Sequence, residues 1–301
     1  MTKLKAILTT ILVAVAMAAA TPIAKAQNDA TAPATLFQYP VAPDTMSSLE
    51  NRVNYIVPRF WDNYDLSRAI RDTVGFVGAF EDYVDLFRYA HRNIVFTAIK
   101  DFMNKAQSNT SNLILIMGIA EQSLFYPGTV YWSDEVYLPF AQFFVEAKNV
   151  KSEYKLRYRD QIKRIENTLQ GIVPPDFTVV KADKSKVKLS DIAGWTLIYF
   201  NEPDCFDCTM TRLRLSTDAT VNAFVESGEL TIVSVYAGSS SAEWMSDSSP
   251  SPESWVVGTC DGLDEVYDVR FIPSFYLLDR EHKIINKNLT LANVQYLLGG
   301  E

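Results

Sequence analysis

Cysteine and histidine are scarce in this chain of 301 residues, which contains three of the first and two of the second. No cysteine occurs in the first 200 residues, so the chain lacks the distributed cysteine pairs of a secreted disulfide scaffold. A structural zinc site needs four ligands, usually two pairs of Cys or His. Besides Cys205 and Cys208, the sequence offers only the scattered Cys260, His91 and His282. We therefore expect neither a metal site nor a cofactor.

An excess of positive charge is also lacking, because the net charge is −8 at pH 7. This balance gives no electrostatic footprint for nucleic acid or for an anionic membrane. Residues 172–301 carry most of the excess negative charge, with 19 acidic against 10 basic side chains. After residue 26 we find no apolar run long enough to span a bilayer. Hydrophobic and charged contents of 48% and 21% instead indicate a globular protein.

The N-terminal residues 1–26 have the pattern of a secretory signal peptide. Lys3 and Lys5 precede an apolar stretch of signal length, and an Ala-x-Ala cleavage site ends at Ala26. An uncleaved anchor is the alternative. Lipid anchoring lacks an acceptor, because no cysteine lies near the cleavage site. We expect an extracytoplasmic mature protein, either in a bacterial periplasm or secreted, that begins with a flexible tail over residues 27–35.

Residues 36–170 show the periodicity of helices. Capping residues predict helix starts near Ser47 and Ser133, and residues 151–170 predict a last, strongly charged helix. The aromatic residues recur at core spacing, which favours a packed all-α domain. A surface for a partner is the alternative for some of them.

A different pattern begins after the break at residues 171–177, which contain one glycine and two prolines. Short apolar runs rich in β-branched and aromatic residues predict strands, with helices between them. We expect a domain over residues 172–301 with a central mixed sheet flanked by helices. The expected strands are 177–181, 187–189, 195–200, 229–236, 274–279 and 283–288, and the expected helices are 208–226, 262–269 and 291–298.

Cys205 and Cys208 lie where the strand predicted over Trp195–Phe200 gives way to a helix. The free N–H groups and the dipole at a helix start stabilise a thiolate there. Residues three apart share one helix face, so the two sulfur atoms can meet as a disulfide. Half of a zinc site and two cysteines that merely pack in a core are the alternatives. The pattern favours a redox pair.

Several segments together resemble a known family. Residues 172–301 resemble the thioredoxin-like domains of secreted bacterial thiol–disulfide oxidoreductases of the TlpA/ResA type, and residues 36–170 loosely resemble a helical domain of unknown function, family 5106, found fused to them. The segments that carry the first resemblance are Pro175-Asp176-Phe177, Leu189-Ser190-Asp191-Ile192-Ala193-Gly194, Tyr199-Phe200-Asn201-Glu202-Pro203-Asp204-Cys205-Phe206-Asp207-Cys208 and Tyr267-Asp268-Val269-Arg270-Phe271-Ile272-Pro273-Ser274.

The resemblance implies roles for four residues. Cys205, nearer the helix start, would be the attacking thiolate, and Cys208 would resolve the mixed disulfide. The Ile272–Pro273 bond would be cis and lie beside the pair, which leaves the Ile272 backbone free to bind an extended substrate strand. The alternative for Pro273 is an ordinary proline at the start of a strand.

The sequence departs from the family pattern near the cysteines. Tyr199 stands where thioredoxin keeps a buried acid, and Thr211 stands where ResA-type relatives place a Glu. Asp204 and Asp207 flank Cys205, and nearby negative charge disfavours a thiolate. We therefore predict the redox potential of a reductant or isomerase rather than that of a strong oxidant.

The predicted function is extracytoplasmic thiol–disulfide oxidoreduction through Cys205 and Cys208. The partners would be disulfide-containing envelope proteins and an unidentified thiol electron donor. A non-catalytic binding or assembly module is the alternative, in which the thioredoxin fold is a scaffold and the helical domain binds a partner.

Overall fold

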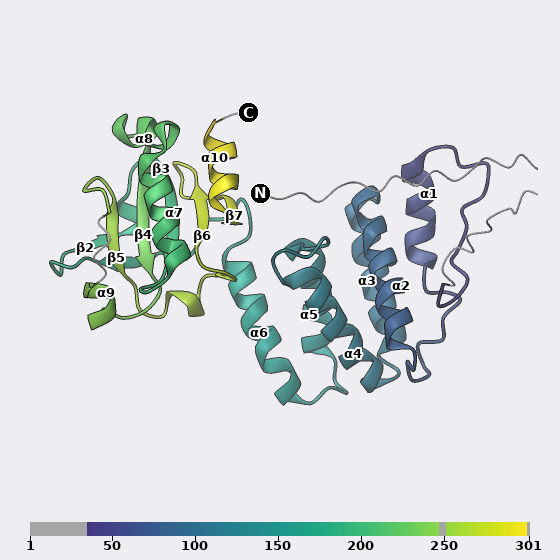
Figure 1. The fold of residues 1–301 in the computed structure, drawn as a ribbon. Helices are drawn as coiled ribbons and strands as arrows, with labels where there is room; N and C mark the ends of the chain where they lie inside the picture. The colour runs from purple at the N-terminus through teal and green to yellow at the C-terminus, as the bar shows by residue number, and fades with distance from the viewer. Residues whose placement is uncertain (1–34, 247–250, 300–301) are drawn as a thin grey trace, which may run out of the picture. The chain divides into compact units, whose positions relative to one another are not determined.

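The structure is a computed structural model that describes residues 35–246 and 251–299. The predicted signal peptide, and the predicted tail up to residue 34, lie outside the described residues. Between residues 35 and 167 the regular elements that the structure describes are all helices, and the first described strand begins at Thr178 (Figure 1). We call residues 36–170 the helical region and residues 172–299 the sheet region.

The helical region follows the predicted periodicity, with small shifts at the helix ends. The first helix begins one residue later than predicted, because Ser48 rather than Ser47 is its N-cap. Ser133 caps its helix as predicted, and its Oγ accepts a hydrogen bond from the backbone N–H of Val136. The elements are α1 (Leu49–Ile56), η1 (Val57–Arg59), α2 (Thr73–Asp85), η2 (Leu86–Tyr89), α3 (Arg92–Ala106), α4 (Thr110–Ala120), the π-helix η3 (Glu121–Phe125), α5 (Asp134–Glu146) and α6 (Ser152–Asn167).

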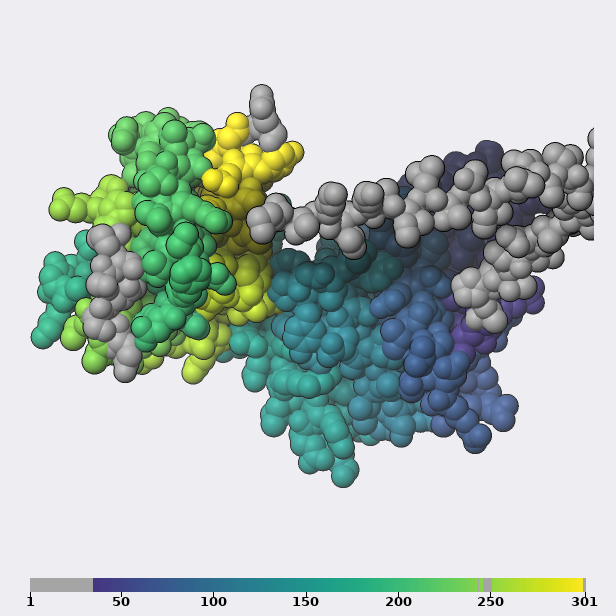
Figure 2. All heavy atoms as spheres, viewed as in Figure 1, coloured from purple at the N-terminus to yellow at the C-terminus, as the bar shows by residue number. Residues whose placement is uncertain are grey.

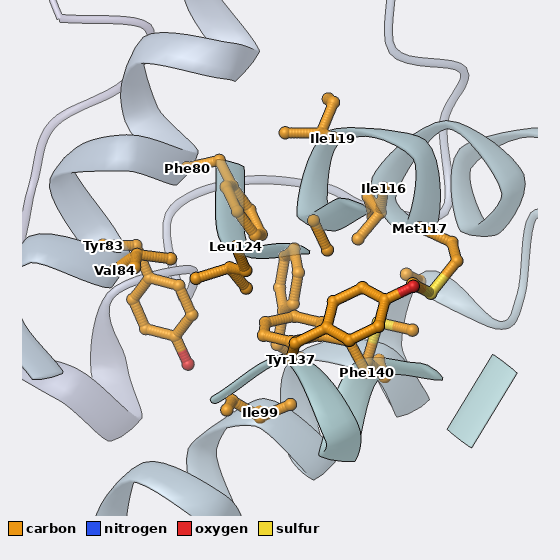
Figure 3. Packing of buried hydrophobic residues seen from close by; sticks show 14 of the residues in the cluster. Phe80, Tyr83, Val84, Ile99, Ile116, Met117, Ile119, Leu124, Tyr137 and Phe140 are labelled. Atoms are coloured by element: carbon orange, nitrogen blue, oxygen red, sulfur yellow. The ribbon is translucent and has the colours of Figure 1, made fainter. Parts of the chain in front are cut away.

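Aromatic side chains fill the core of the helical region. The ring of Trp61 stacks on those of Phe76 and Phe102, with centroid distances of 5.0 and 4.7 Å. The buried side chains of Tyr137 and Phe140 of α5 belong to the same cluster as Ile116 and Met117 of α4 (Figure 3). The predicted core role of the aromatic residues is confirmed for these side chains.

The sheet region contains a seven-stranded mixed sheet in the order β2-β1-β5-β4-β3-β6-β7. The inner strand β3 pairs parallel to β4 and antiparallel to β6, and β4 pairs parallel to β5. The remaining pairs are antiparallel. The elements are β1 (Thr178–Val180), β2 (Lys186–Lys188), η4 (Leu189–Asp191), β3 (Trp195–Asn201), α7 (Phe206–Thr217), α8 (Ala219–Glu226), β4 (Leu230–Tyr236), α9 (Ala242–Ser246), β5 (Val256–Thr259), η5 (Leu263–Glu265), β6 (Ser274–Leu278), β7 (Ile284–Leu289) and α10 (Leu291–Gly299).

Three sequence predictions in this region were wrong in detail. The helix predicted over residues 262–269 is only the three-residue 3₁₀-helix η5. The single helix predicted over residues 208–226 is two helices, because the backbone of Asp218 is extended and its carboxylate caps α8 by accepting from the N–H of Val221. The strand β5 was not predicted, although it lies inside the sheet between β1 and β4.

Side chains of β3 alternate between the two faces of the sheet. Ile198 and Phe200 join one hydrophobic cluster, and Leu197 and Tyr199 join a second cluster on the opposite face. In the space-filling view, the green atoms of α7 and α8 lie at the surface of the sheet region (Figure 2). The two clusters therefore give the sheet a packed layer on each side.

The segment that follows α6 pairs with Ile284, the first residue of β7. The backbone N–H of Gly171 donates to the carbonyl of Ile284 at 2.8 Å, and the N–H of Ile284 donates to the carbonyl of Ile172 at 2.9 Å. These two hydrogen bonds fix the end of the helical region to the last strand of the sheet.

Candidate active site

Cys205 and Cys208 form a disulfide at the N-terminus of α7. The S–S distance is 2.11 Å and the Cα atoms are 5.2 Å apart. Cys205 is the N-cap of α7, where its Sγ accepts a hydrogen bond from the backbone N–H of Cys208 at 3.1 Å. Cys205 is half-buried, whereas Cys208 is fully buried. The sulfur of Cys205 is therefore the more accessible of the two.

A tight turn presents the pair. Asp204 has a φ of +57°, a left-handed conformation that Asp tolerates better than most residues. Asp204 and Asp207 are exposed on either side of Cys205, and Phe206 is 75% exposed between the two cysteines. The surface around the pair thus combines two carboxylates with one apolar ring.

Ile272 and Pro273 lie at the same end of the sheet as the cysteines. The Ile272–Pro273 bond is cis, as the resemblance implies. Because Phe200 at the end of β3 pairs with Ser274 at the start of β6, the segments after β3 and before β6 meet. Ile272 packs against the same hydrophobic cluster as the cysteines. The structure thus brings the four predicted residues together, and their roles stay predictions.

Tyr199 occupies the position at which thioredoxin keeps a buried acid. It is fully buried, its ring stacks on Phe275 with the centroids 4.9 Å apart, and its hydroxyl donates to the carbonyl oxygen of Cys208 at 2.7 Å. The side chain therefore braces the first turn of α7 against the sheet.

A buried cluster of charges lies beside the loop that leads to Pro273. The Arg270 guanidinium donates to both carboxylate oxygens of Asp268 at 3.0 and 2.6 Å, and the Lys287 ammonium donates to Asp268 at 3.0 Å. Burial raises the pKa of Asp268, but the two cations lower it more, so that its pKa lies below its ordinary value.

Asp134 of α5 completes this cluster from the helical region, with contacts to Arg270 and Lys287. Sequence analysis missed this contact, because 136 positions separate Asp134 from Arg270. The sequence carries no local pattern that pairs them.

Cys260 follows β5 and belongs to the cluster on the face of the sheet opposite the cysteine pair. It is half-buried rather than a fully buried core residue. Burial raises the pKa of its thiol, and the nearby Asp261 carboxylate adds to this. Its reactivity at neutral pH is correspondingly low.

Within residues 35–246 and 251–299, no group of three or more His, Cys, Asp or Glu side chains could hold a metal ion. None of the helices in these ranges has the length and apolar character needed to cross a bilayer.

Similar solved structures identify the fold. A thioredoxin-like protein from Bacteroides caccae ATCC 43185 matches with a TM-score of 0.78 at 21% identity, over 89% of this chain and 99% of that chain. At this identity the match shows a shared fold and nothing finer. The predicted fold class, a thioredoxin-like mixed sheet preceded by an all-α region, is confirmed.

Two further structures each match less than half of this chain. A thiol:disulfide interchange protein from Bacteroides sp. gives a TM-score of 0.36 at 24% identity, over 44% of this chain and 93% of that chain. The C-terminal domain of an uncharacterized protein from Bacteroides fragilis NCTC 9343 gives 0.40 at 24% identity, over 44% and 99%. These low scores carry no argument, and no curated protein matches the chain.

A protein-family model identifies the other half. The model described as "Domain of unknown function (DUF5106)" matches residues 17–168, which confirms the resemblance drawn for the helical region. The chain therefore belongs to the DUF5106 family and carries, after its helical region, a thioredoxin-like fold.

Proposed function

We propose that this protein is an extracytoplasmic thiol–disulfide oxidoreductase that acts on disulfides of envelope proteins. The observation that carries the proposal is the position of Cys205. It caps α7, is more accessible than Cys208, and shares one sheet end with Ile272 and Pro273. A helix N-terminus favours the thiolate that the chemistry needs.

The exchange takes two steps. In the reduced protein the Cys205 thiolate attacks a substrate disulfide, which forms a mixed disulfide and releases one substrate thiolate. The Cys208 thiolate then attacks the sulfur of Cys205 and releases the second substrate thiolate. The substrate gains two electrons, and the pair becomes the disulfide of the structure. An unidentified thiol donor returns two electrons to the pair.

Insulin reduction with dithiothreitol as the donor tests this function. The wild type should accelerate reduction, and Cys205→Ser should abolish the acceleration because the attacking sulfur is gone. Cys208→Ser should instead accumulate a mixed disulfide at Cys205, which non-reducing mass spectrometry detects. Cys260→Ser is the matched control and should behave like the wild type. Equal activity of wild type and Cys205→Ser would reject the proposal.

A binding or assembly module is the second candidate. Tyr199 favours it, because a hydroxyl that donates to the Cys208 carbonyl replaces the acid that thioredoxin keeps there. In this case insulin reduction by the wild type would not exceed the dithiothreitol background. Full-length Cys205→Ser would then still bind the partner of the helical region in a pull-down.

The division into domains is part of the proposal. We place a helical domain at residues 36–170, a thioredoxin-like domain at 172–301, and the cleavage of the signal peptide after Ala26. The family match that ends at residue 168 supports this boundary. Limited proteolysis should release a folded fragment that begins near Ile172, as circular dichroism of the purified fragment would verify. An unfolded fragment would mean that the two domains share a core.

A further inference from the structure

The four charged side chains beside the Pro273 loop are buried far more deeply than ion pairs at a protein surface. Asp268 and Arg270 are 3% and 4% exposed, and Lys287 and Asp134 are 11% and 14% exposed. Two cations face two anions, so their charges balance. A buried charge that loses its partner is strongly destabilising. The arrangement is therefore constrained to keep all four members in place.

One member of the cluster comes from a different region than the other three. Asp134 is the first residue of α5, and it contacts Arg270 with one carboxylate oxygen and Lys287 with the other, at 2.7 Å for the lysine. Phe125 adds two contacts from the helical region. Its carbonyl accepts from Arg270 Nη1 at 2.6 Å, and its ring lies 4.0 Å below the guanidinium.

The guanidinium that the helical region holds belongs to the loop at the cysteine pair. Arg270 precedes Pro273 by three residues, so their Cα atoms lie within about 11 Å of each other. The carbonyl of Asp268 accepts from the buried hydroxyl of Tyr276 at 2.6 Å, which ties the start of the same loop to β6. Ile272 packs against the same hydrophobic cluster as the cysteines. A shift of Arg270 would therefore move the backbone that leads to Ile272 and Pro273.

We propose that Asp134 is a positioning residue for thiol–disulfide exchange, which holds Arg270 and thereby fixes the loop of Ile272 and Pro273 for an incoming substrate strand. The inference rests on the proposed function, because it assigns that loop to substrate binding. It gives the helical region a part in the redox reaction: α5 sets the shape of the site without touching the substrate.

The neighbouring carboxylate offers a matched control. Glu135 stands beside Asp134 in the first turn of α5, so both experience the same helix dipole. Its carboxylate contacts Arg92 of the helical region, with both side chains exposed. Glu135→Gln removes one negative charge from the same turn and leaves the Arg270 cluster intact.

The experiment compares Asp134→Asn with Glu135→Gln in the full-length protein, using insulin reduction below the unfolding temperature of both variants. Asp134→Asn should raise KM about tenfold and leave kcat within about twofold, because it disturbs substrate binding rather than the reacting sulfur atoms. Glu135→Gln should leave both constants unchanged. Asp134→Glu, which keeps the net charge of the cluster at zero, should bring KM most of the way back to the wild-type value. This variant remains informative if Asp134→Asn does not fold.

A double-variant cycle tests whether Asp134 acts through the loop. In the Pro273→Ala background, Asp134→Asn should have little further effect on KM, since coupled residues are not additive. A full tenfold rise in KM in that background would overturn the inference. So would a KM for Asp134→Asn equal to that of Glu135→Gln.

Hydrogen exchange separates this inference from the proposed function. The backbone N–H groups of Phe271, Ile272 and Ser274 should exchange about tenfold faster in Asp134→Asn than in Glu135→Gln, because the loop opens more often. If the wild type reduces no disulfide, the proposed function fails while this readout still tests the link between Asp134 and the loop. Unchanged exchange in an active protein would reject the link alone.

Discussion

The helical region and the sheet region each bury a carboxylate, but with partners of different origin. Glu121 is 3% exposed and accepts from Gln161 at 2.8 Å and Tyr158 at 3.2 Å, both on α6. Asp268 binds Arg270 and Lys287, which in turn bind Asp134 of the other region. The first network fastens α6 to η3 within one region, and the second joins two regions at the candidate site.

The first way to test this comparison is to remove the carboxylate at the centre of the second network. Asp268→Asn should lower the free energy of unfolding by about 3–5 kcal/mol, because it leaves two buried cations with one anion. Chemical denaturation would measure the loss. Asp264→Asn, a nearby exposed aspartate, is the control and should stay within about 0.5 kcal/mol of the wild type. A loss below 1 kcal/mol would contradict the importance of the cluster.

The same substitution should change the response to acid. The pKa of Asp268 is lower in the folded protein than its unfolded value of about 3.9. Its contribution to stability is therefore fully present above the unfolded pKa, at about pH 4, and is lost as the pH falls through the lower folded pKa. The stability of Asp268→Asn should accordingly decline less between about pH 4 and pH 2 than that of the wild type.

A smaller effect is expected in the first network. Glu121→Ala should lower the free energy of unfolding by about 1–3 kcal/mol, because Gln161 and Tyr158 lose a buried acceptor. Insulin reduction should stay at the wild-type rate, since the network is confined to the helical region. Gln122→Ala changes the exposed neighbour and should alter neither quantity. A large rise in KM for Glu121→Ala would contradict the prediction that the first network has no effect on the candidate site.

Substitution of an exposed carboxylate beside the cysteine pair should have the smallest effect, a small change in redox potential. Asp207 is exposed, so solvent and salt screen its effect on the Cys205 thiolate. Asp207→His should make the pair more oxidising by less than about 30 mV, which corresponds to about 1.4 kcal/mol. Equilibration with glutathione would measure this, and Asp207→Asn separates loss of the negative charge from gain of a positive one. The wild type itself should lie nearer to thioredoxin, about −270 mV, than to DsbA, about −120 mV.

The sequence predicted those parts of the fold that depend on local patterns. The apolar run of β3 and the capping residues of α5 are visible within a few positions, and the structure has both. The strand β5 was missed because four residues carry too little periodicity to separate a strand from a loop. The break at Asp218 was missed because an apolar helical pattern continues on both sides of its capping aspartate.

The candidate site divides in the same way. The cysteine pair and Pro273 belong to contiguous motifs, so their places could be predicted from the resemblance. The contact of Asp134 with Arg270 forms only when helices and sheet have folded, and no spacing in the sequence encodes it. Likewise, Tyr199 could be seen as a departure from the family pattern, but its hydrogen bond to Cys208 could not be foreseen.

The two hydrogen bonds that Gly171 and Ile172 make to Ile284 have a consequence for association between molecules. An edge strand with free N–H and C=O groups is a template on which another chain can add a strand. In the intact protein, the segment after α6 occupies the N–H and C=O groups of Ile284 at the start of β7. A redox fragment cut after Ile172 would leave these groups unpaired, so that another chain could add a strand to β7. A fragment that begins a few residues before Gly171 would keep them paired.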